Sequence, residues 1–132
     1  MGATWILKRW LEEGVPELER SAENLVELLP HATDWRVQLH LLQMLPSLRV
    51  PVASLKVLTT VLPGLVMDEN KFVRAWALSG LAALADQSDE LRQDVVSETM
   101  KAETDHAPSV RARVRQIRKR YTWTTHAGRA MR

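Results

Sequence analysis

The chain has 132 residues, 45% of them hydrophobic, and it contains no cysteine. That length predicts a single domain whose core needs no metal or disulfide, and the lack of cysteine excludes disulfide bonds and thiolate metal sites. Residues 1–14 interrupt their apolar run with charges, unlike a signal peptide, and no apolar stretch approaches the about 20 residues that span a bilayer. We therefore expect a cytoplasmic protein that does not enter a membrane.

The small net charge of +2 conceals an uneven distribution along the chain. Residues 1–105 hold 10 Lys/Arg and 16 Asp/Glu, whereas residues 106–132 hold 8 Lys/Arg and no acidic residue. A segment of one sign can mark the end of a chain that binds a partner.

Helix signals recur through the chain. Asp34 suits an N-cap, Ser88 suits another, and Pro108 suits the first turn of a helix. Residues 52–62 are rich in β-branched residues, so a strand is conceivable there, but the helical surroundings favour a helix that Pro63 stops or kinks. The expected helices are 4–13, 16–29, 35–45, 52–62 with a further turn at 65–67, 71–85, 88–101 and 109–120.

Residues 68–86 are the expected centre of the domain. Turn-forming residues at 68–70 precede a run without proline that is apolar over most of a helical circumference. Such a helix has to be covered on more than one side. We therefore expect a sandwiched central helix, with Trp76 in the core and Gly80 where another helix approaches closely.

The face pattern of this helix recurs. Val73 and Arg74, moved by 37 residues, fall on Val110 and Arg111, and moved back by 38 they fall on Trp35 and Arg36. The preceding segments also correspond, because leucines at 18, 25 and 28 recur 37 residues later at 55, 62 and 65. A helix pair repeated at such a period is typical of a stacked repeat protein. In this alignment Trp35 takes the place of Val73 and is expected to be buried.

These pairs resemble the HEAT repeat family of α-solenoids. The resemblance implies an all-α fold, a right-handed α-solenoid of about three HEAT-like antiparallel helix pairs plus a short N-terminal helix. One domain would cover residues 1–121, with repeats at about 16–46, 51–85 and 88–121, and residues 122–132 would be a flexible basic tail. The second helices of the pairs, 35–45, 71–85 and 109–120, would line the concave face.

The family pattern places an Asp in the turn of each pair and an Arg six residues later. Asp68 with Arg74 and Asp105 with Arg111 have this spacing, whereas Arg36 has a proline six residues before it. The two pairs could be read as acid–base pairs. The resemblance instead implies a structural ladder that ties neighbouring repeats together, and we expect that role.

No motif indicates catalysis or a cofactor. His31, His40, His106 and His126 lack the close spacing of metal ligands, and the chain has no phosphate-binding glycine motif or nucleophile motif. The dipeptide at 34–35 is similar to the Asp and Trp that some HEAT-like DNA glycosylases use, but nothing beyond it matches. We expect no catalytic, cofactor-binding or metal-binding residue.

The final helix carries the strongest functional signal. An apolar stripe at 110, 114, 117 and 121 is surrounded by basic residues. The candidate partner- or anion-binding residues are Arg111, Arg113, Arg115, Arg118, Lys119 and Arg120. A terminal repeat also needs a polar outer face, so the same residues suit a solubilising cap. If the row at 111, 115 and 118 borders the concave face, it forms a positive rim there.

These observations favour a non-catalytic protein-interaction or scaffold module whose partner is another protein with an acidic surface. The alternative is a nucleic-acid-binding protein that uses the basic C-terminal helix. That alternative has few aromatic residues for stacking on bases, only Tyr121 and Trp123 near the basic cluster. A glycosylase-type enzyme is the least supported of the three.

Overall fold

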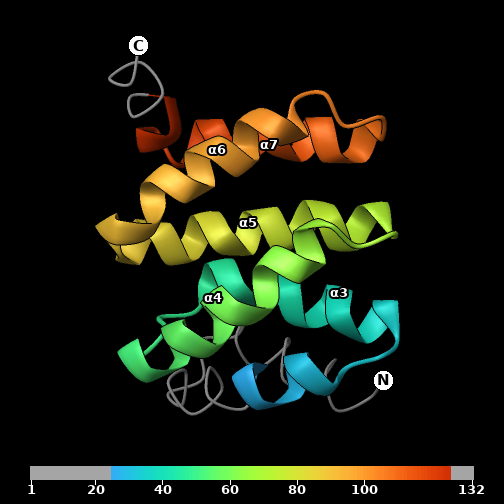
Figure 1. Cartoon of the computed structure of the whole chain (residues 1–132), viewed down its shortest axis with the longest axis vertical. Helices are drawn as coiled ribbons and strands as arrows, with labels where there is room; N and C mark the ends of the chain where they lie inside the picture. The colour runs from blue at the N-terminus through green and yellow to red at the C-terminus, as the bar shows by residue number, and fades with distance from the viewer. Residues whose placement is uncertain (1–24, 126–132) are drawn as a thin grey trace.

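The computed structural model describes residues 25–125, and every regular element in that range is a helix, which confirms the all-α prediction (Figure 1). The expected helix 4–13, most of the helix 16–29, and residues 126–132 with His126 lie outside the described residues. The α-helices are α3 (Trp35–Met44), α4 (Val52–Val66), α5 (Lys71–Gln87), α6 (Arg92–Ala102) and α7 (Pro108–Arg120). The 3-10 helices are η1 (Leu29–His31), η2 (Leu45–Ser47) and η3 (Asp89–Leu91).

Local capping chemistry explains where the long helices begin. The Asp34 carboxylate accepts a hydrogen bond from the Arg36 N–H at the start of α3, as predicted. The Asn70 side chain accepts from two N–H groups at the start of α5, and Pro108 opens α7. Ser88 takes the N-cap position of η3, which precedes α6, but its side chain makes no cap bond.

Helix α4 corrects a predicted boundary. The sequence predicted a helix at 52–62 that Pro63 stops or kinks, with a further turn at 65–67. Helix α4 instead runs without a break through Pro63 to Val66, so the proline does not stop it. A proline inside a helix removes only one N–H donor, and this one lies a few residues before the end. The last turn then closes with bonds from the Met67 N–H to the Gly64 carbonyl and from the Asp68 N–H to the Leu65 carbonyl. The local strand alternative for this segment does not occur.

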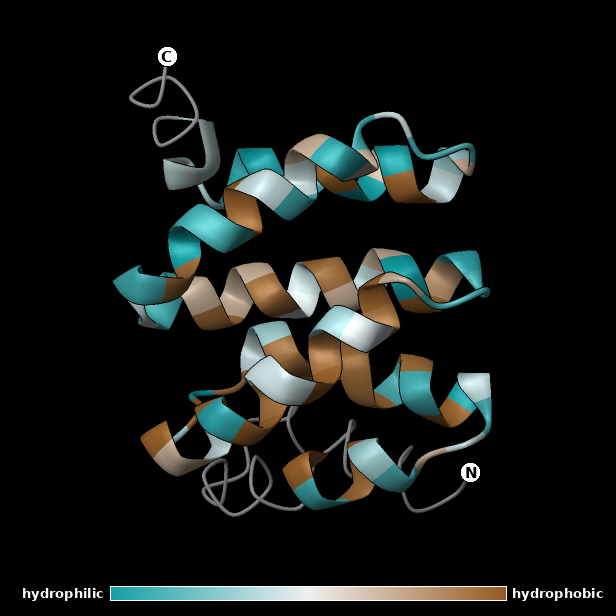
Figure 2. Ribbon diagram, viewed as in Figure 1, coloured by the Kyte–Doolittle hydropathy of each residue, from teal (hydrophilic) through white to brown (hydrophobic). Residues whose placement is uncertain are grey.

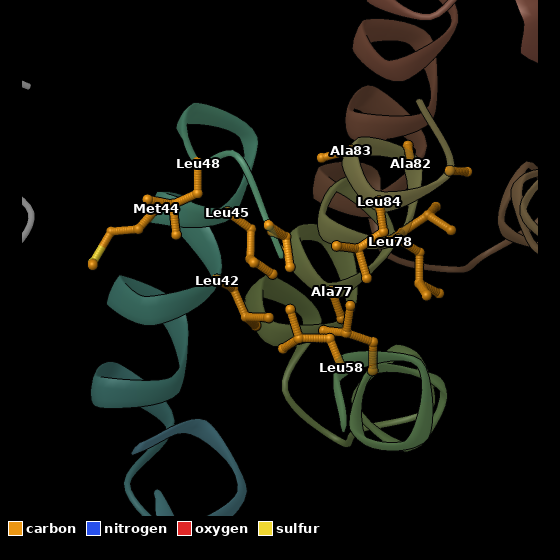
Figure 3. Packing of buried hydrophobic residues seen from close by; sticks show 14 of the residues in the cluster. Leu42, Met44, Leu45, Leu48, Leu58, Ala77, Leu78, Ala82, Ala83 and Leu84 are labelled. Atoms are coloured by element: carbon orange, nitrogen blue, oxygen red, sulfur yellow. The ribbon is translucent and has the colours of Figure 1, made fainter. Parts of the chain in front are cut away.

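Helix α5 lies at the centre of the molecule, as the sequence predicted. It contacts α3, α4, α6 and α7, and it runs between the α3/α4 and α6/α7 pairs in Figure 1. Its residues from 77 to 85 are all buried. Figure 3 shows side chains of α5 meeting those of α3, η2 and α4 in one apolar cluster. At Gly80 a Cβ would lie 2.7 Å from Leu45 Cδ1, so the glycine allows the close approach expected there.

The burial pattern corrects the predicted repeat register by two residues. The buried stripe at 73, 77, 80 and 84 in α5 recurs at 110, 114, 117 and 121, as predicted. In the α3 region the stripe falls at 37, which is partly buried, and at the buried positions 41, 44 and 48, which is 36 residues earlier and not 38. Trp35 is therefore not the equivalent of Val73, and its side chain is 39% exposed. The caps Asp34 and Asn70, 36 residues apart, set this register.

Two residues after α7, Trp123 and Thr124, still pack against the core. The Trp123 indole donates a hydrogen bond to Asp86 Oδ1 at 3.0 Å, and the buried Thr124 hydroxyl donates to the Tyr121 carbonyl. These residues had been assigned to the start of a flexible tail. In Figure 2, hydrophilic residues alternate with hydrophobic ones along α7.

None of the helices in the described range is long and apolar enough to cross a membrane.

A candidate binding groove on the α3, α5 and α7 face

The predicted ladder residues meet at the turns before α5 and α7. The Arg74 guanidinium donates to both carboxylate oxygens of Asp105, from Nε at 3.2 Å and Nη2 at 3.1 Å. Its Nη1 donates to the carbonyls of Asp68 and Glu69 in its own turn. Both charged side chains are mostly buried, with 13% and 16% of their surface exposed. Arg74 thus links the turn before its own helix to the turn before the next one.

Each turn also accepts a bond from the side chain six residues later. Arg111 donates to the Asp105 carbonyl at 2.7 Å, as Arg74 does to the Asp68 carbonyl. In the corrected register the equivalent of Arg74 in α3 is Gln38, and its amide donates to the Ala32 carbonyl at 2.9 Å. The sequence pattern aligned Arg36 with Arg74, but Arg36 lies two residues before Gln38 and therefore on a different face of α3. The neutral, shorter Gln38 keeps the bond within its own turn.

The pKa of the Asp105 carboxyl group is shifted by its surroundings in the turn before α7. Burial alone would raise the pKa of its carboxyl group. The Ala107 N–H donates to it at 2.8 Å and Arg74 adds two bonds and its charge, so the pKa lies below the ordinary value of 3.8. The Asp68 carboxylate accepts from the Asn70 N–H, and Arg74 reaches only its backbone carbonyl.

The six predicted anion-binding residues do not act together. Arg111 binds the Asp105 carbonyl and Arg118 pairs with Glu103, so this row faces the turn between α6 and α7. The predicted rim at 111, 115 and 118 therefore does not border the face shared by α3, α5 and α7. Arg115 and Lys119 are exposed and make no hydrogen bond or ion pair within residues 25–125. Arg113 and Arg120 turn the other way.

A groove of about 340 Å³ runs across α3, α5 and α7 on the side of Arg113 and Arg120. We call it the α3/α5/α7 groove. Its side chains occupy equivalent positions of the three helices, since residues 43, 79 and 116 are related by the same 36- and 37-residue steps as the core. It is lined by Gln43, Pro46, Ser47, Trp76, Ser79, Arg113, Gln116, Ile117, Arg120 and Tyr121.

Arg113 is the unusual charge in this groove. Its guanidinium carbon lies 4.0 Å from the centre of the Trp76 ring, a cation–π contact between α7 and α5. No carboxylate of the described residues pairs with it, and no described acceptor takes a hydrogen bond from it. Burial without a compensating anion lowers the pKa of Arg113. A guanidinium in this state has five free donors for a carboxylate or phosphate.

Neither family models, curated proteins nor solved structures match this chain. The groove has to be interpreted from its own chemistry.

Arg120 forms the other end of the α3/α5/α7 groove. Its guanidinium donates to the Pro46 carbonyl at 3.1 Å. Its guanidinium also lies 5.4 Å from the ring centre of Tyr121. Burial raises the pKa of Tyr121; the charge of Arg120 lowers it and that of Asp86 raises it, and the net shift is upward. This end of the groove is thus already bridged within the chain.

Two buried polar side-chain atoms between residues 25 and 125 lack a hydrogen-bond partner. His40 Nδ1 and Ser109 Oγ are inaccessible to solvent and form no hydrogen bond in the described structure. His40 occupies the position of α3 that corresponds to Trp76 in α5 and Arg113 in α7. Unsatisfied buried atoms of this kind call for a functional or structural explanation.

The charges that line the other cavities between residues 25 and 125 are either exposed to solvent or paired within the chain. A second cavity, of about 240 Å³, contains Arg74, Asp105, Lys101 and Glu98, but these four residues are paired with one another. No cluster of three His, Asp or Glu side chains suited to a metal ion occurs between residues 25 and 125. The α3/α5/α7 groove is therefore the best candidate site.

Sequence reasoning missed an aromatic pair next to this groove. Trp35 and Phe72 stack with their ring centres 6.4 Å apart, and both are substantially exposed. Arg36 lies 5.7 Å from the Trp35 ring centre, and Lys71 lies 5.3 Å from that of Phe72. We call these four residues the aromatic–cation patch. Phe72 is four residues before Trp76 and so lies on the same side of α5, one turn away.

Proposed function

We propose that this chain is a non-catalytic protein-interaction module, a small α-solenoid of three HEAT-like helix pairs whose second helices offer a groove to a partner protein. The repeated turn contacts support the solenoid part of the proposal. Bonds from residues 38, 74 and 111 to the carbonyl six positions earlier occur at the start of each second helix. Arg74 joins two successive turns as a ladder residue of the HEAT type would.

The observation that carries the functional part is the state of Arg113. The Arg113 guanidinium is partly desolvated, stacks on Trp76 and has no anion as a partner. Burying a charge in this way costs free energy unless a ligand supplies the anion. A carboxylate of a partner protein would accept a bidentate pair of hydrogen bonds from it. The groove around it also contains the hydroxyl group of Ser79 and the amide group of Gln116. This combination suits a protein with an acidic surface.

The nucleic-acid alternative has weaker support. The affinity for a nucleic-acid backbone rises when several unpaired cations lie in a row and each contacts a phosphate. Here Arg111, Arg118 and Arg120 are occupied by contacts within the chain, and Arg113 and Arg115 lie on different sides of α7. The remaining free charges do not form a continuous stripe, so binding to a generic polyanion should be weak.

The test is site-specific photo-crosslinking in cells that produce the protein. A crosslinking residue at Gln116, in the groove, should capture a protein that the same residue at Arg115 does not capture. The purified partner should then bind Arg113→Glu at least about tenfold more weakly than the parent chain. Arg115→Glu, the same change on the same helix but outside the groove, should have an effect of at most about twofold.

The nucleic-acid alternative is tested with the same variants. Fluorescence anisotropy with random-sequence DNA and RNA at about 150 mM salt should show no binding tighter than micromolar. Submicromolar binding that Arg115→Glu abolishes would contradict the protein-interaction proposal.

A further inference from the structure

The α3/α5/α7 groove and the aromatic–cation patch lie next to each other along α5. Phe72 and Trp76 are one helical turn apart, which is about 6 Å along the helix axis. Phe72 stacks on Trp35, and Trp76 carries the guanidinium of Arg113. The apolar surface of Trp35 and Phe72 and the unpaired cation of Arg113 therefore lie one after the other along a line that follows α5.

Cations outnumber acidic residues around this line. Arg36 and Lys71 flank the aromatic pair, and Arg113 lies in the groove. Asp34, the acidic residue next to Trp35, is used as the N-cap of α3. The side chains of Trp35 and Phe72 are 39% and 41% exposed, so a ligand can reach both rings. Adjacent exposed aromatic rings with cations at both ends are typical of a surface that binds another molecule.

We propose that this line binds one extended segment of a partner protein, in which an acidic side chain and a large apolar side chain are two residues apart. An extended chain advances about 3.3 Å per residue, and its side chains two residues apart lie on one side. Their separation is therefore close to the rise of about 6 Å between Phe72 and Trp76 along α5. The acidic side chain pairs with Arg113, and the apolar side chain covers Trp35 and Phe72. The inference rests on the proposed function and adds the chemical class of the bound segment.

The experiment uses the full chain and a panel of nonapeptides in a glycine–serine background. Each peptide carries one glutamate and one phenylalanine, placed one to five positions apart. Binding is followed by NMR through the indole N–H signals, which suits weak complexes. The peptide with a separation of two should shift the signals of Trp35 and Trp76 and bind at least about threefold tighter than the peptides with separations of one or five. Trp123, whose indole donates to Asp86, should not shift.

Two variants separate the contributions of the two side chains. In Arg113→Glu, replacing the peptide glutamate by glutamine should no longer weaken binding, whereas in Arg115→Glu it should still do so. In Phe72→Ala, which removes an exposed ring, replacing the peptide phenylalanine by alanine should have at most about half its effect on the parent chain. Circular dichroism of each variant checks that it is folded.

Equal affinity for all separations, or shifts that Arg113→Glu leaves unchanged, would overturn the inference. So would the absence of any shift up to about 1 mM peptide, a concentration that detects even very weak complexes. The proposed function fails separately, when a crosslinked partner binds Arg113→Glu as tightly as the parent chain. A partner that needs Arg113 but whose bound segment lacks the acidic–apolar pair would leave the proposed function intact and refute only this inference.

Discussion

Replacing Asp105 by alanine tests how much the contact between successive turns stabilises the molecule. The change removes two hydrogen bonds from Arg74 and one from the Ala107 N–H. Hydrogen bonds to charged groups contribute about 1.5–3 kcal/mol each, and the bond from the Ala107 N–H holds the turn before α7. Arg74 would also lose the carboxylate that neutralises it in a site where it is 13% exposed.

We expect the free energy of unfolding to fall by about 3 kcal/mol in Asp105→Ala. The loss should stay below the about 5 kcal/mol typical of the largest effects at fully buried pairs, because Arg74 keeps its bonds to the carbonyls of Asp68 and Glu69. Urea unfolding followed by circular dichroism measures the change. Glu98→Ala provides the control, since its pair with Lys101 is solvent-exposed and should contribute less than about 1 kcal/mol.

A double-mutant cycle isolates the pair itself. Arg74→Ala, Asp105→Ala and the double variant should give a coupling energy of about 1–2 kcal/mol. A loss below about 0.5 kcal/mol in Asp105→Ala would refute the reasoning, because it would mean that the contact between the turns is energetically neutral.

Four further outcomes follow from the same geometry. Asp68→Ala should cost only about 1 kcal/mol in urea unfolding, because its carboxylate accepts one backbone bond; a loss equal to that of Asp105→Ala would contradict this. The pKa of Asp105 is lowered on folding, so its stabilisation is present above about pH 4 and is lost as the pH falls through the folded-state pKa. The stability difference between the parent chain and Asp105→Asn should therefore shrink on acidification, and a constant difference would count against it. Gly80→Ala should destabilise by about 1 kcal/mol, since the new methyl group meets Leu45 at 2.7 Å and the strain exceeds the gain in helix propensity; a more stable variant would show that Leu45 yields freely. Trp76→Ala should cost about 2–3 kcal/mol, less than for a fully buried tryptophan, and a change under about 1 kcal/mol would mean that the ring is barely packed.

The sequence predicted the helices well because their signals are local. Asp34 and Pro108 act within one turn, and the apolar run of α5 shows its burial without reference to its neighbours. The end of α4 was misplaced because the cost of Pro63 depends on how close the helix end is, which a sequence alone does not fix. The first repeat was misaligned because Trp35 and Arg36 imitate Val73 and Arg74. Alignment on the caps at 34 and 70 would have given the 36-residue step.

The sequence predicted only part of the candidate site, namely the basic residues of the final helix. Helical periodicity separates Arg111, Arg115 and Arg118 from Arg113 and Arg120 as two rows. It does not say which row faces the neighbouring helices, because that depends on how α7 packs against α5. The contact between Arg113 and Trp76 joins residues 37 positions apart, which come together only because α7 packs against α5. The stacking of Trp35 on Phe72 was hidden for the same reason, together with the misplaced register.

The central position of α5 has a consequence for how the molecule comes apart. In a long repeat array each unit contacts only its neighbours, so the array can fray from one end. Here one helix contacts α3, α4, α6 and α7, and its loss would remove the main contact surface of all four. Hydrogen exchange of the α5 amides should therefore require global unfolding, with the same free energy for its residues 77 to 85. The described helices would then form a single cooperative unit in spite of their repeated sequence.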